Sequence, residues 1–260
     1  MSRAAALAGC LVLAGCATPA KVPVVVPPPG YLEAGAVRSL ADQAAPPSAV
    51  FSSADLLPEG PGTDRWWLAI AHAELRPPDA AQHFDCALGT RLGETPRPAL
   101  ARVMSRLLVD ADRLTRAMAE AHVRPRPIRV VESLQPCQRI DDATRNSASW
   151  PAGGAVAGAA YGELFAALAP DRAVEVRRIG QEIGRSRAVC RMNWPADVAA
   201  GAAAGARLYA RAAASADFPA DLAAARAEVA AARAEGLTHP GCAAERRALS
   251  QAGRGAASAP

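Results

Sequence analysis

The sequence predicts an all-α protein with a single domain, and three observations support this fold class. The chain has 260 residues, which is enough for one sizeable domain. Hydrophobic residues make up 51% of it but aromatic residues only 4%, so the apolar part is mostly Ala, Leu and Val, and Ala favours helix over strand. Several segments also repeat apolar residues at helical spacing. We therefore expect closely packed helices with small side chains in one core.

The N-terminal residues have the pattern of a bacterial targeting segment. Arg3 precedes an apolar stretch, 4–14, that is too short to cross a membrane. Leu13-Ala14-Gly15-Cys16 then resembles a lipobox, which implies cleavage before Cys16 and attachment of lipid to that cysteine. Ala17 follows in place of Asp, and the sorting rules that this resemblance implies favour the outer membrane of the bacterial envelope, on its periplasmic side. An ordinary signal peptide with a chance cysteine is the alternative.

These features divide the chain into four segments. A lipoprotein signal peptide is expected at residues 1–15, and the lipidated cysteine, a Pro-rich tether and an N-terminal arm at residues 16–61. The folded domain is expected at residues 62–250, because no linker or internal repeat divides that region. Residues 251–260 are expected to form a disordered tail, with fraying after Arg247.

Apolar periodicity and capping residues predict six helices within the domain. Thr95 and Pro96 form a suitable N-cap and first-turn pair for the second helix. In the fourth helix, Val174, Ile179 and Ile183 are expected to face inward. The expected ranges are 64–75, 95–122, 153–168, 171–184, 195–211 and 219–234.

Two further patterns concern the packing and the surface. Gly201 and Gly205 lie four residues apart in the fifth helix, which favours close helix packing over contact with a ligand. The net charge of +4 is carried by arginines that are scattered among acidic residues, with Lys21 as the only lysine. This pattern predicts a solvated surface of mixed charge and gives little support to nucleic-acid binding. It does not predict an oligomeric state.

Four cysteines lie in the predicted domain, and an even number in an oxidising periplasm permits two disulfides. Three pairings are possible, and the sequence does not choose among them. The chain has no CxxC or HxxxH spacing, so a metal site is not predicted. The four residues are Cys86, Cys137, Cys190 and Cys242.

Three segments, in this order along the chain, contain the candidate functional residues. The first ends with Arg126-Pro127, the second occupies 149–154, and the third begins with Ser186-Arg187. In the third segment, five residues separate Arg187 from Asn193, and three separate Asn193 from Asp197. The order and spacing of the three segments resemble the signature of the class A non-specific acid phosphatases, which belong to the PAP2 and vanadium-haloperoxidase superfamily.

The resemblance runs from about residue 56 to about residue 249 and implies the helical bundle of this family. Arg126, Arg187 and the N–H of Gly153 match the groups that bind phosphate in the family. Asp197 matches the carboxylate that orients the nucleophilic histidine. Four positions depart from the family pattern: Ala119 replaces a lysine, Ala152 a serine, Gly154 the general-acid histidine and Asn193 the nucleophilic histidine.

The chemistry that the resemblance implies depends on the groups that are missing. In the family, one histidine attacks phosphorus, a second protonates the leaving oxygen, and cationic and N–H groups hold the other oxygens. The amide of Asn193 neither attacks phosphorus nor exchanges a proton near neutral pH. Loss of the nucleophile in another hydrolase has cost about a million-fold in rate, and loss of a general acid about a hundred- to ten-thousand-fold. We therefore predict a pseudophosphatase that needs no cofactor and retains a pocket for phosphate or vanadate.

Two alternatives remain open at this stage. An active phosphomonoesterase with a rebuilt site could use His122, which lies in the first segment, or a thiolate of Cys190. A structural or partner-binding envelope protein is the other alternative. The expected partners are a phosphate-type small molecule and the membrane, which the lipid on Cys16 would reach.

Overall fold

The computed structural model describes residues 28–47 and 51–254, and for residues 251–254 it describes the backbone alone. The signal peptide, the lipobox and Cys16 lie outside the described residues, as does the end of the predicted tail, 255–260. The four-segment division of the chain therefore stays a prediction.

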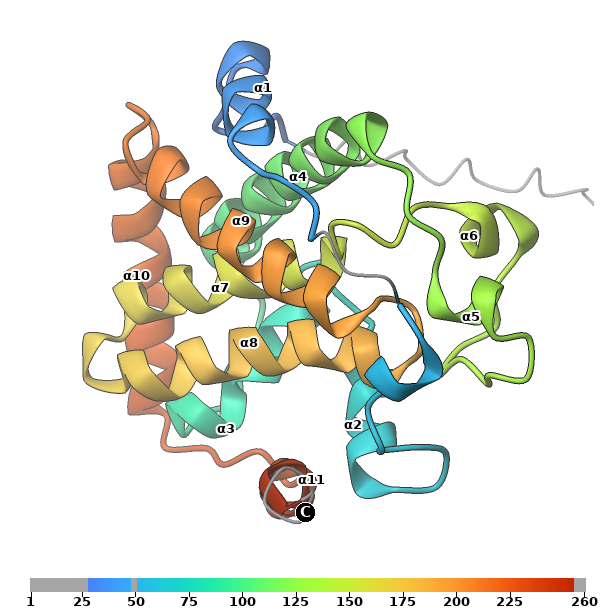
Figure 1. Cartoon of the computed structure of the whole chain (residues 1–260). Coiled ribbons are helices and arrows are strands. Elements are labelled where there is room, and N and C mark those ends of the chain that lie inside the picture. The colour runs from blue at the N-terminus through green and yellow to red at the C-terminus, as the bar shows by residue number, and fades with distance from the viewer. Residues whose placement is uncertain (1–27, 48–50, 255–260) are drawn as a thin grey trace, which may run out of the picture.

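The described residues form eleven α-helices and three short 3-10 helices, without a β-strand, so the all-α prediction is confirmed. Figure 1 shows α7 and α8 running side by side through the centre, with α9 next to them and α10 at one end. The helices are α1 (Ala34–Asp42), α2 (Asp64–Ala71), α3 (Asp85–Leu88), α4 (Pro98–Ala121), α5 (Pro127–Val130), α6 (Asp142–Asn146), α7 (Gly153–Leu168), α8 (Ala173–Val189), α9 (Pro195–Ala213), α10 (Phe218–Ala234) and α11 (Cys242–Arg254), with η1 (Ser53–Asp55), η2 (Asp79–Phe84) and η3 (Pro170–Arg172).

The central position of α7 follows from its sequence. Glu163 is its only charged residue, and most of the others are buried. A helix that is apolar all round must be covered on several sides, and α4, α8 and α9 pack around it. The contacts are close because small residues make them. A methyl group added at Gly158 would lie 2.6 Å from the carbonyl oxygen of Gly180, and one at Gly205 would overlap the carbonyl oxygen of Val156. The close packing predicted for the fifth helix is thereby confirmed.

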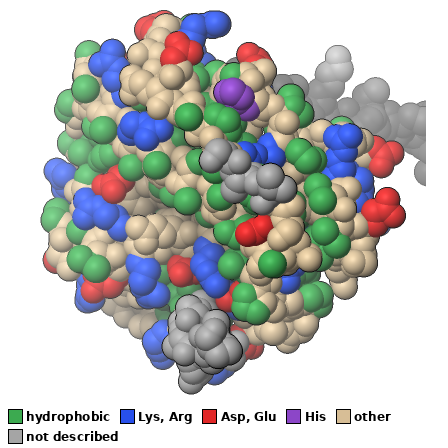
Figure 2. All heavy atoms as spheres, viewed as in Figure 1, with side chains coloured by type: hydrophobic (Ala, Val, Ile, Leu, Met, Phe, Trp, Pro, Cys, Tyr) green, Lys and Arg blue, Asp and Glu red, His purple; other side chains and the backbone are tan. Residues whose placement is uncertain are grey.

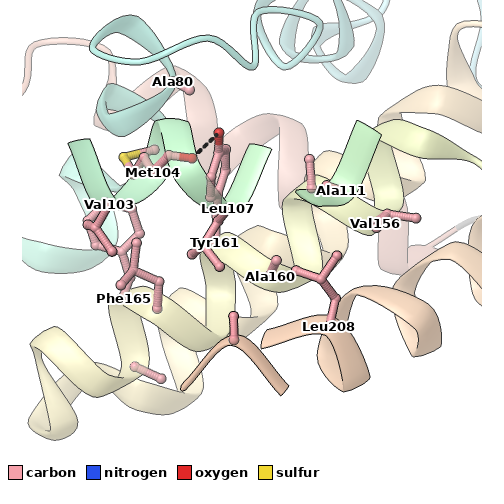
Figure 3. Close-up of a cluster of buried hydrophobic side chains, with 14 of the residues drawn as sticks. Ala80, Val103, Met104, Leu107, Ala111, Val156, Ala160, Tyr161, Phe165 and Leu208 are labelled. Carbon is pink, nitrogen blue, oxygen red and sulfur yellow. Dashed lines mark hydrogen bonds between the residues drawn. The ribbon is translucent and has the colours of Figure 1, made fainter. Parts of the chain in front are cut away.

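The larger core cluster fills the space between α4, α7 and α9 (Figure 3). In this cluster Leu107 of α4 lies near Tyr161 of α7, and Val103 lies near Phe165; all four are fully buried. The Tyr161 hydroxyl donates to the backbone oxygen of Leu75 at 3.0 Å and approaches that of Met104 at 3.4 Å. A buried tyrosine needs such a partner, because an unpaired hydroxyl in the core is costly.

All six predicted helices are present, and most of them have shifted ends. α7 has the predicted bounds, and α9 and α10 begin and end within two residues of prediction. α4 begins at Pro98 instead of Pro96, with Arg97 as the N-cap residue. α2 ends at Ala71, and the chain then leads into Pro77 and Pro78, which do not continue a helix.

The register of α8 differs from the prediction. Val174 is 78% exposed, whereas Val176, Ile179 and Ile183 are buried. Counted from Val176, the buried positions follow the three- and four-residue steps of one helix face, and Val174 falls on the opposite face. The helix also extends to Val189, five residues beyond the predicted end.

Five helices were not predicted from the sequence: the short helices α3, α5 and α6, and the longer helices α1 and α11. α1 lies in the N-terminal arm, where Val37 and Leu40 are buried against α4. α11 includes the residues after Arg247 that were expected to fray, and Ala248 within it is 2% exposed. A disulfide between Cys86 and Cys242 joins α11 to α3 covalently. The second disulfide pairs Cys137 with Cys190. Together they form one of the three pairings that the sequence left open.

The surface carries intermixed charges. On the face that Figure 2 shows, basic and acidic side chains are interspersed. No helix within residues 28–47 and 51–254 is both long and apolar enough to cross a bilayer.

Asp85 is a buried carboxyl group that organises the turn after α3. Its Oδ1 accepts a hydrogen bond from the N–H of Leu92 at 2.9 Å, and its backbone oxygen accepts one from the N–H of Thr90 at 3.1 Å. Gly89, with φ of 68°, supplies the left-handed backbone of that turn. Burial raises the pKa of Asp85 from 3.8 to about 7, although the hydrogen bond from Leu92 and the charge of Arg91 oppose the shift.

The raised pKa of Asp85 predicts that part of the stability is lost as pH rises. The folded protein keeps a proton on Asp85 up to about pH 7, whereas the unfolded chain releases it near 3.8. The folded state therefore binds more protons in this range, and the free energy of unfolding falls as pH increases through it. Asp85→Asn keeps the Oδ1 acceptor but does not ionise, so it is expected to flatten the pH dependence. Urea denaturation at about pH 5 and about pH 8 measures the slope. An unchanged slope in Asp85→Asn, with the exposed Asp142→Asn as control, would contradict this assignment.

Candidate functional site

One cavity of about 400 Å³ opens where the end of α4, the start of α7 and the end of α8 meet. We call it the α7 cavity. Residues between α5 and α7 and the turn before α9 complete its wall. Six of the positions selected from the sequence line it, namely Ala119, Arg126, Gly153, Gly154, Arg187 and Asn193. Residues from the three sequence segments therefore meet at one place in the fold.

A tight turn after α8 brings Asn193 back to the cavity. The backbone oxygen of Arg187 accepts from the N–H of Met192 at 3.0 Å and from that of Asn193 at 3.2 Å. Arg191 has a φ of 62°, the left-handed conformation that reverses the chain after a helix. The Asn193 side chain is 3% exposed, and its Nδ2 donates to the backbone oxygen of Ser149 at 2.6 Å. The amide of Asn193 thus joins the turn after α8 to the segment before α7.

Arg187 supplies a cation that no described protein group neutralises. Its side chain is half-buried, and no acceptor in the described residues forms a hydrogen bond with its guanidinium group. Burial, followed by the positive charge of Arg126, lowers the pKa of Arg187 to about 10. The side chain also lies against Gly154, where an added Cβ would be 2.7 Å from the Arg187 Cδ. A larger residue at position 154 would therefore require Arg187 to move.

Arg126 faces the same cavity, but its guanidinium is already bonded to the protein. Its Nη1 donates to the backbone oxygen of Met192 at 2.7 Å, its Nε to that of Thr144 at 3.1 Å and its Nη2 to the Ser147 hydroxyl at 2.9 Å. Burial lowers the pKa of Arg126, and the charge of Asp197 acts in the opposite direction. Arg126 therefore adds positive potential to the cavity while holding its wall together.

The start of α7 adds backbone donors. The N–H groups of Ala155 and Val156 both bond to the backbone oxygen of Ala152, so they belong to the helix. Gly153 and Gly154 precede these bonds, and their N–H groups belong to the first turn, which has no partner within a helix. Both residues line the α7 cavity. The N-terminus of a helix favours an anion through these donors and through the helix dipole.

Two selected residues lie beside the cavity instead of in its wall. Ala152 is fully buried, and its N–H donates to the backbone oxygen of Asp197 at 3.1 Å. The Asp197 carboxylate forms an ion pair with Arg124 at 3.1 Å, and Arg124 also donates to the backbone oxygen of Pro47. Burial raises the pKa of Asp197, while a hydrogen bond with Ser149 and the charge of Arg124 oppose this shift. Asp197 therefore holds Arg124 in place, and through Arg124 it holds the N-terminal arm at Pro47.

The sequence did not identify the groups at the other end of the cavity. Asp112, Thr115 and Arg116 of α4 line it, together with Gln138. The Thr115 hydroxyl is buried and has no hydrogen-bond partner in the described residues. Thr115 lies four residues before Ala119, so helical spacing from that position would have indicated it.

The two groups considered as replacement nucleophiles are not placed for that role. His122 is exposed and does not line the α7 cavity, and its ring meets Trp150 edge-on at 5.5 Å. The sulfur of Cys190 is bonded to Cys137, so it offers no thiolate in this structure. The described wall of the cavity contains arginines, N–H groups, amides, the Thr115 hydroxyl and the Asp112 carboxyl group, but no imidazole. This arrangement can bind an anion, and it lacks the histidine that attacks phosphorus in the family that the sequence resembles.

Comparison with known proteins identifies the family. No model of a protein family matches the sequence. The acid phosphatase of Zymomonas mobilis is 33% identical to the chain over 180 residues, which cover 68% of this chain and 67% of that protein. The chain belongs to the acid phosphatase family. Two non-specific acid phosphatases support this assignment. That of Salmonella typhimurium is 29% identical over 170 residues, or 65% of this chain and 68% of its own length. That of Providencia stuartii is 27% identical over 208 residues, or 79% of each chain.

We expect the buried amide of Asn193 to stabilise the folded protein. Asn193→Ala leaves the backbone oxygen of the fully buried Ser149 without its donor, which costs about 1–3 kcal/mol. Asn146→Ala is the control, because the Asn146 amide bonds to Asp142 on the exposed surface of α6 and its loss should change stability by less than about 0.5 kcal/mol. Urea denaturation compares the two variants. Equal, small effects would show that Asn193 does not hold the turn.

Proposed function

We propose that this chain is a degenerate relative of the class A non-specific acid phosphatases, in the PAP2 superfamily. In this proposal it binds phosphate or a similar oxyanion in the α7 cavity but does not hydrolyse phosphate esters efficiently. One observation carries the proposal: the cavity contains both Arg187, whose guanidinium has no acceptor in the described residues, and an amide, Asn193, at the position of the nucleophile.

The charge distribution favours an oxyanion. Arg187 and Arg126 lie close enough for the charge of one to lower the pKa of the other, so an anion between them relieves their repulsion. The planar guanidinium of Arg187 can offer two N–H groups to two oxygens of one phosphate. The first-turn N–H groups of Gly153 and Gly154 add neutral donors on the same cavity wall.

The same geometry argues against turnover. Asn193 has no nucleophilic nitrogen, and its amide is already used by Ser149. Position 154, where the resemblance implies a general-acid histidine, is a glycine whose side-chain space Arg187 fills. Position 119, where it implies a lysine, is an alanine in the cavity wall. An active enzyme with a rebuilt site would need a nucleophile other than position 193, and the positions of His122 and Cys190 do not favour either of them.

Ligand-linked stabilisation tests the proposed pocket. Phosphate or vanadate is expected to raise the melting temperature of the protein, since a ligand at about a hundred times its Kd adds about 2.7 kcal/mol. Arg187→Ala is expected to abolish this increase. Arg177→Ala, on the same helix but paired with Glu163 on the surface, should retain it. A purely structural or partner-binding protein would show no ligand-dependent shift in any variant.

The same samples test the missing chemistry. Hydrolysis of para-nitrophenyl phosphate is expected to stay at background between acidic and neutral pH. Turnover at the rates of the active relatives, abolished by Arg187→Ala, would overturn the inactive assignment. Trapping of a phosphorylated side chain in the α7 cavity would overturn it as well.

We also propose that the protein is a lipoprotein of the bacterial envelope, held on the periplasmic side of the outer membrane through Cys16. Cys16→Ala is expected to prevent lipid attachment and to release the protein from the membrane fraction of a bacterial host. Cys10→Ala is the matched control, because Leu7-Ala8-Gly9-Cys10 repeats the same letters with less apolar sequence before it. Cell fractionation and the mass of the N-terminal peptide measure the result. Loss of the lipid in Cys10→Ala but not in Cys16→Ala would contradict the proposal.

A further inference from the structure

One disulfide includes a cysteine at the N-terminus of a helix, and the other includes a cysteine at the C-terminus of a helix. Cys242 is the first residue of α11, a helix of 13 residues, whereas Cys190 is the C-cap residue of α8. Each of these buried cysteines is bonded to a partner that is half-buried, Cys86 in one case and Cys137 in the other. The positive end of a helix dipole stabilises a thiolate and the negative end destabilises it. If the bonds are cleaved, Cys242 is therefore the better leaving group.

An imidazole reinforces this difference. A ring nitrogen of His239 and the two sulfur atoms of Cys86 and Cys242 all lie within 4.8 Å of one another. The His239 Nδ1 accepts a hydrogen bond from the N–H of Gly241 at 3.1 Å, so the neutral ring carries its proton on Nε2. An imidazole beside a disulfide can favour the thiolate form of a departing sulfur.

The other disulfide has a different environment. Cys190 is 1% exposed and packs in the smaller apolar cluster with Val189 and Met192. Apolar surroundings raise the pKa of a thiol and disfavour its departure as a thiolate. Among the described residues, the grouping of Cys86, His239 and Cys242 is the one in which three such ligating atoms come this close, and the second disulfide has no counterpart.

We propose that Cys86 is a thiol-modification site, at which an external thiol forms a mixed disulfide while Cys242 leaves as a thiolate. The incoming thiolate attacks the Cys86 Sγ, a new S–S bond forms there, and the electron pair of the old bond goes to the Cys242 Sγ. With a dithiol, the second thiol then displaces Cys86, so the reagent is oxidised to a disulfide and the protein gains two thiols. Attack is expected at Cys86 because this residue is half-buried, whereas Cys242 is 8% exposed.

Two carboxyl groups close to the disulfide along the chain oppose a thiolate on Cys242, and they oppose it least in mildly acidic solution. Asp85 precedes Cys86, and Glu245 lies one turn after Cys242. Burial raises the pKa of both carboxyl groups, to about 7 for Asp85, which reduces the negative charge that they hold in mildly acidic solution.

Opening the bond releases one attachment of α11 and leaves the others. α11 also packs on α2, and Arg247 of α11 forms an ion pair with Asp64 of α2 at 3.6 Å. A groove of about 580 Å³ lies between these two helices, and His239 is part of its wall. Modification of Cys86 would therefore loosen the first turn of α11 beside this groove without removing the core packing around α7.

Partial reduction tests the site on the unmodified protein. The native chain is treated with limiting dithiothreitol, quenched with acid, alkylated and mapped by peptide mass. We expect Cys86 and Cys242 to become alkylated at least about tenfold faster than Cys137 and Cys190, which serve as the internal reference. With glutathione, the mixed disulfide is expected on Cys86.

Substitution of the imidazole separates its contribution. His239→Ala is expected to slow reduction of the Cys86–Cys242 bond several-fold and to leave the other disulfide unchanged. His122→Ala, which alters an exposed histidine away from both disulfides, should change neither rate. Equal reduction rates for the two disulfides, earlier release of Cys190, or a glutathione adduct on Cys242 would each overturn the proposal. None of these readouts depends on phosphate binding in the α7 cavity.

Discussion

The close approach of α7 to α8 and α9 is the constraint on which the rest of the structure depends. Gly158 faces the backbone of Gly180, and Gly205 faces that of Val156. At these two crossing points, no side chain separates the helix backbones. This packing fixes the start of α7 beside the end of α8 and the start of α9. The first-turn N–H groups of α7, the Arg187 side chain and the turn that carries Asn193 consequently share one cavity wall. A side chain added at a crossing point would therefore disturb the site as well as the core.

The sequence predicted what local signals determine. The apolar run of small residues fixed the bounds of α7, and a proline marked the start of α9. The register of α8 was wrong at Val174, because that stretch has few apolar residues and two of its possible faces differ by only one valine. α11 was missed because its residues are polar overall, and it is held by contacts with α2 and by a disulfide to α3 that no local pattern reveals.

For the candidate site, too, the sequence indicated some features and not others. The order and spacing of three segments indicated which positions meet, because a shared fold brings them together. The sequence could not indicate which partner each side chain takes. Asp197 pairs with Arg124, and Arg126 bonds to Met192 and Ser147, through contacts between residues that are far apart in the chain or on irregular segments. Thr115 lies outside the three segments, and only its helical spacing from Ala119 could have indicated that it lines the cavity.

The loss of catalytic groups that we propose agrees with the packing around positions 154 and 193. Arg187 lies where a side chain at position 154 would project, and the Asn193 amide is bonded to the backbone of Ser149. A histidine restored at position 154 would have to displace Arg187, and one at position 193 would have to replace a buried hydrogen bond. Each change therefore alters the anion-binding group or the turn that supports it. In the proposed function, the site is therefore an anion pocket with its own internal contacts, and restoring single residues would disturb those contacts.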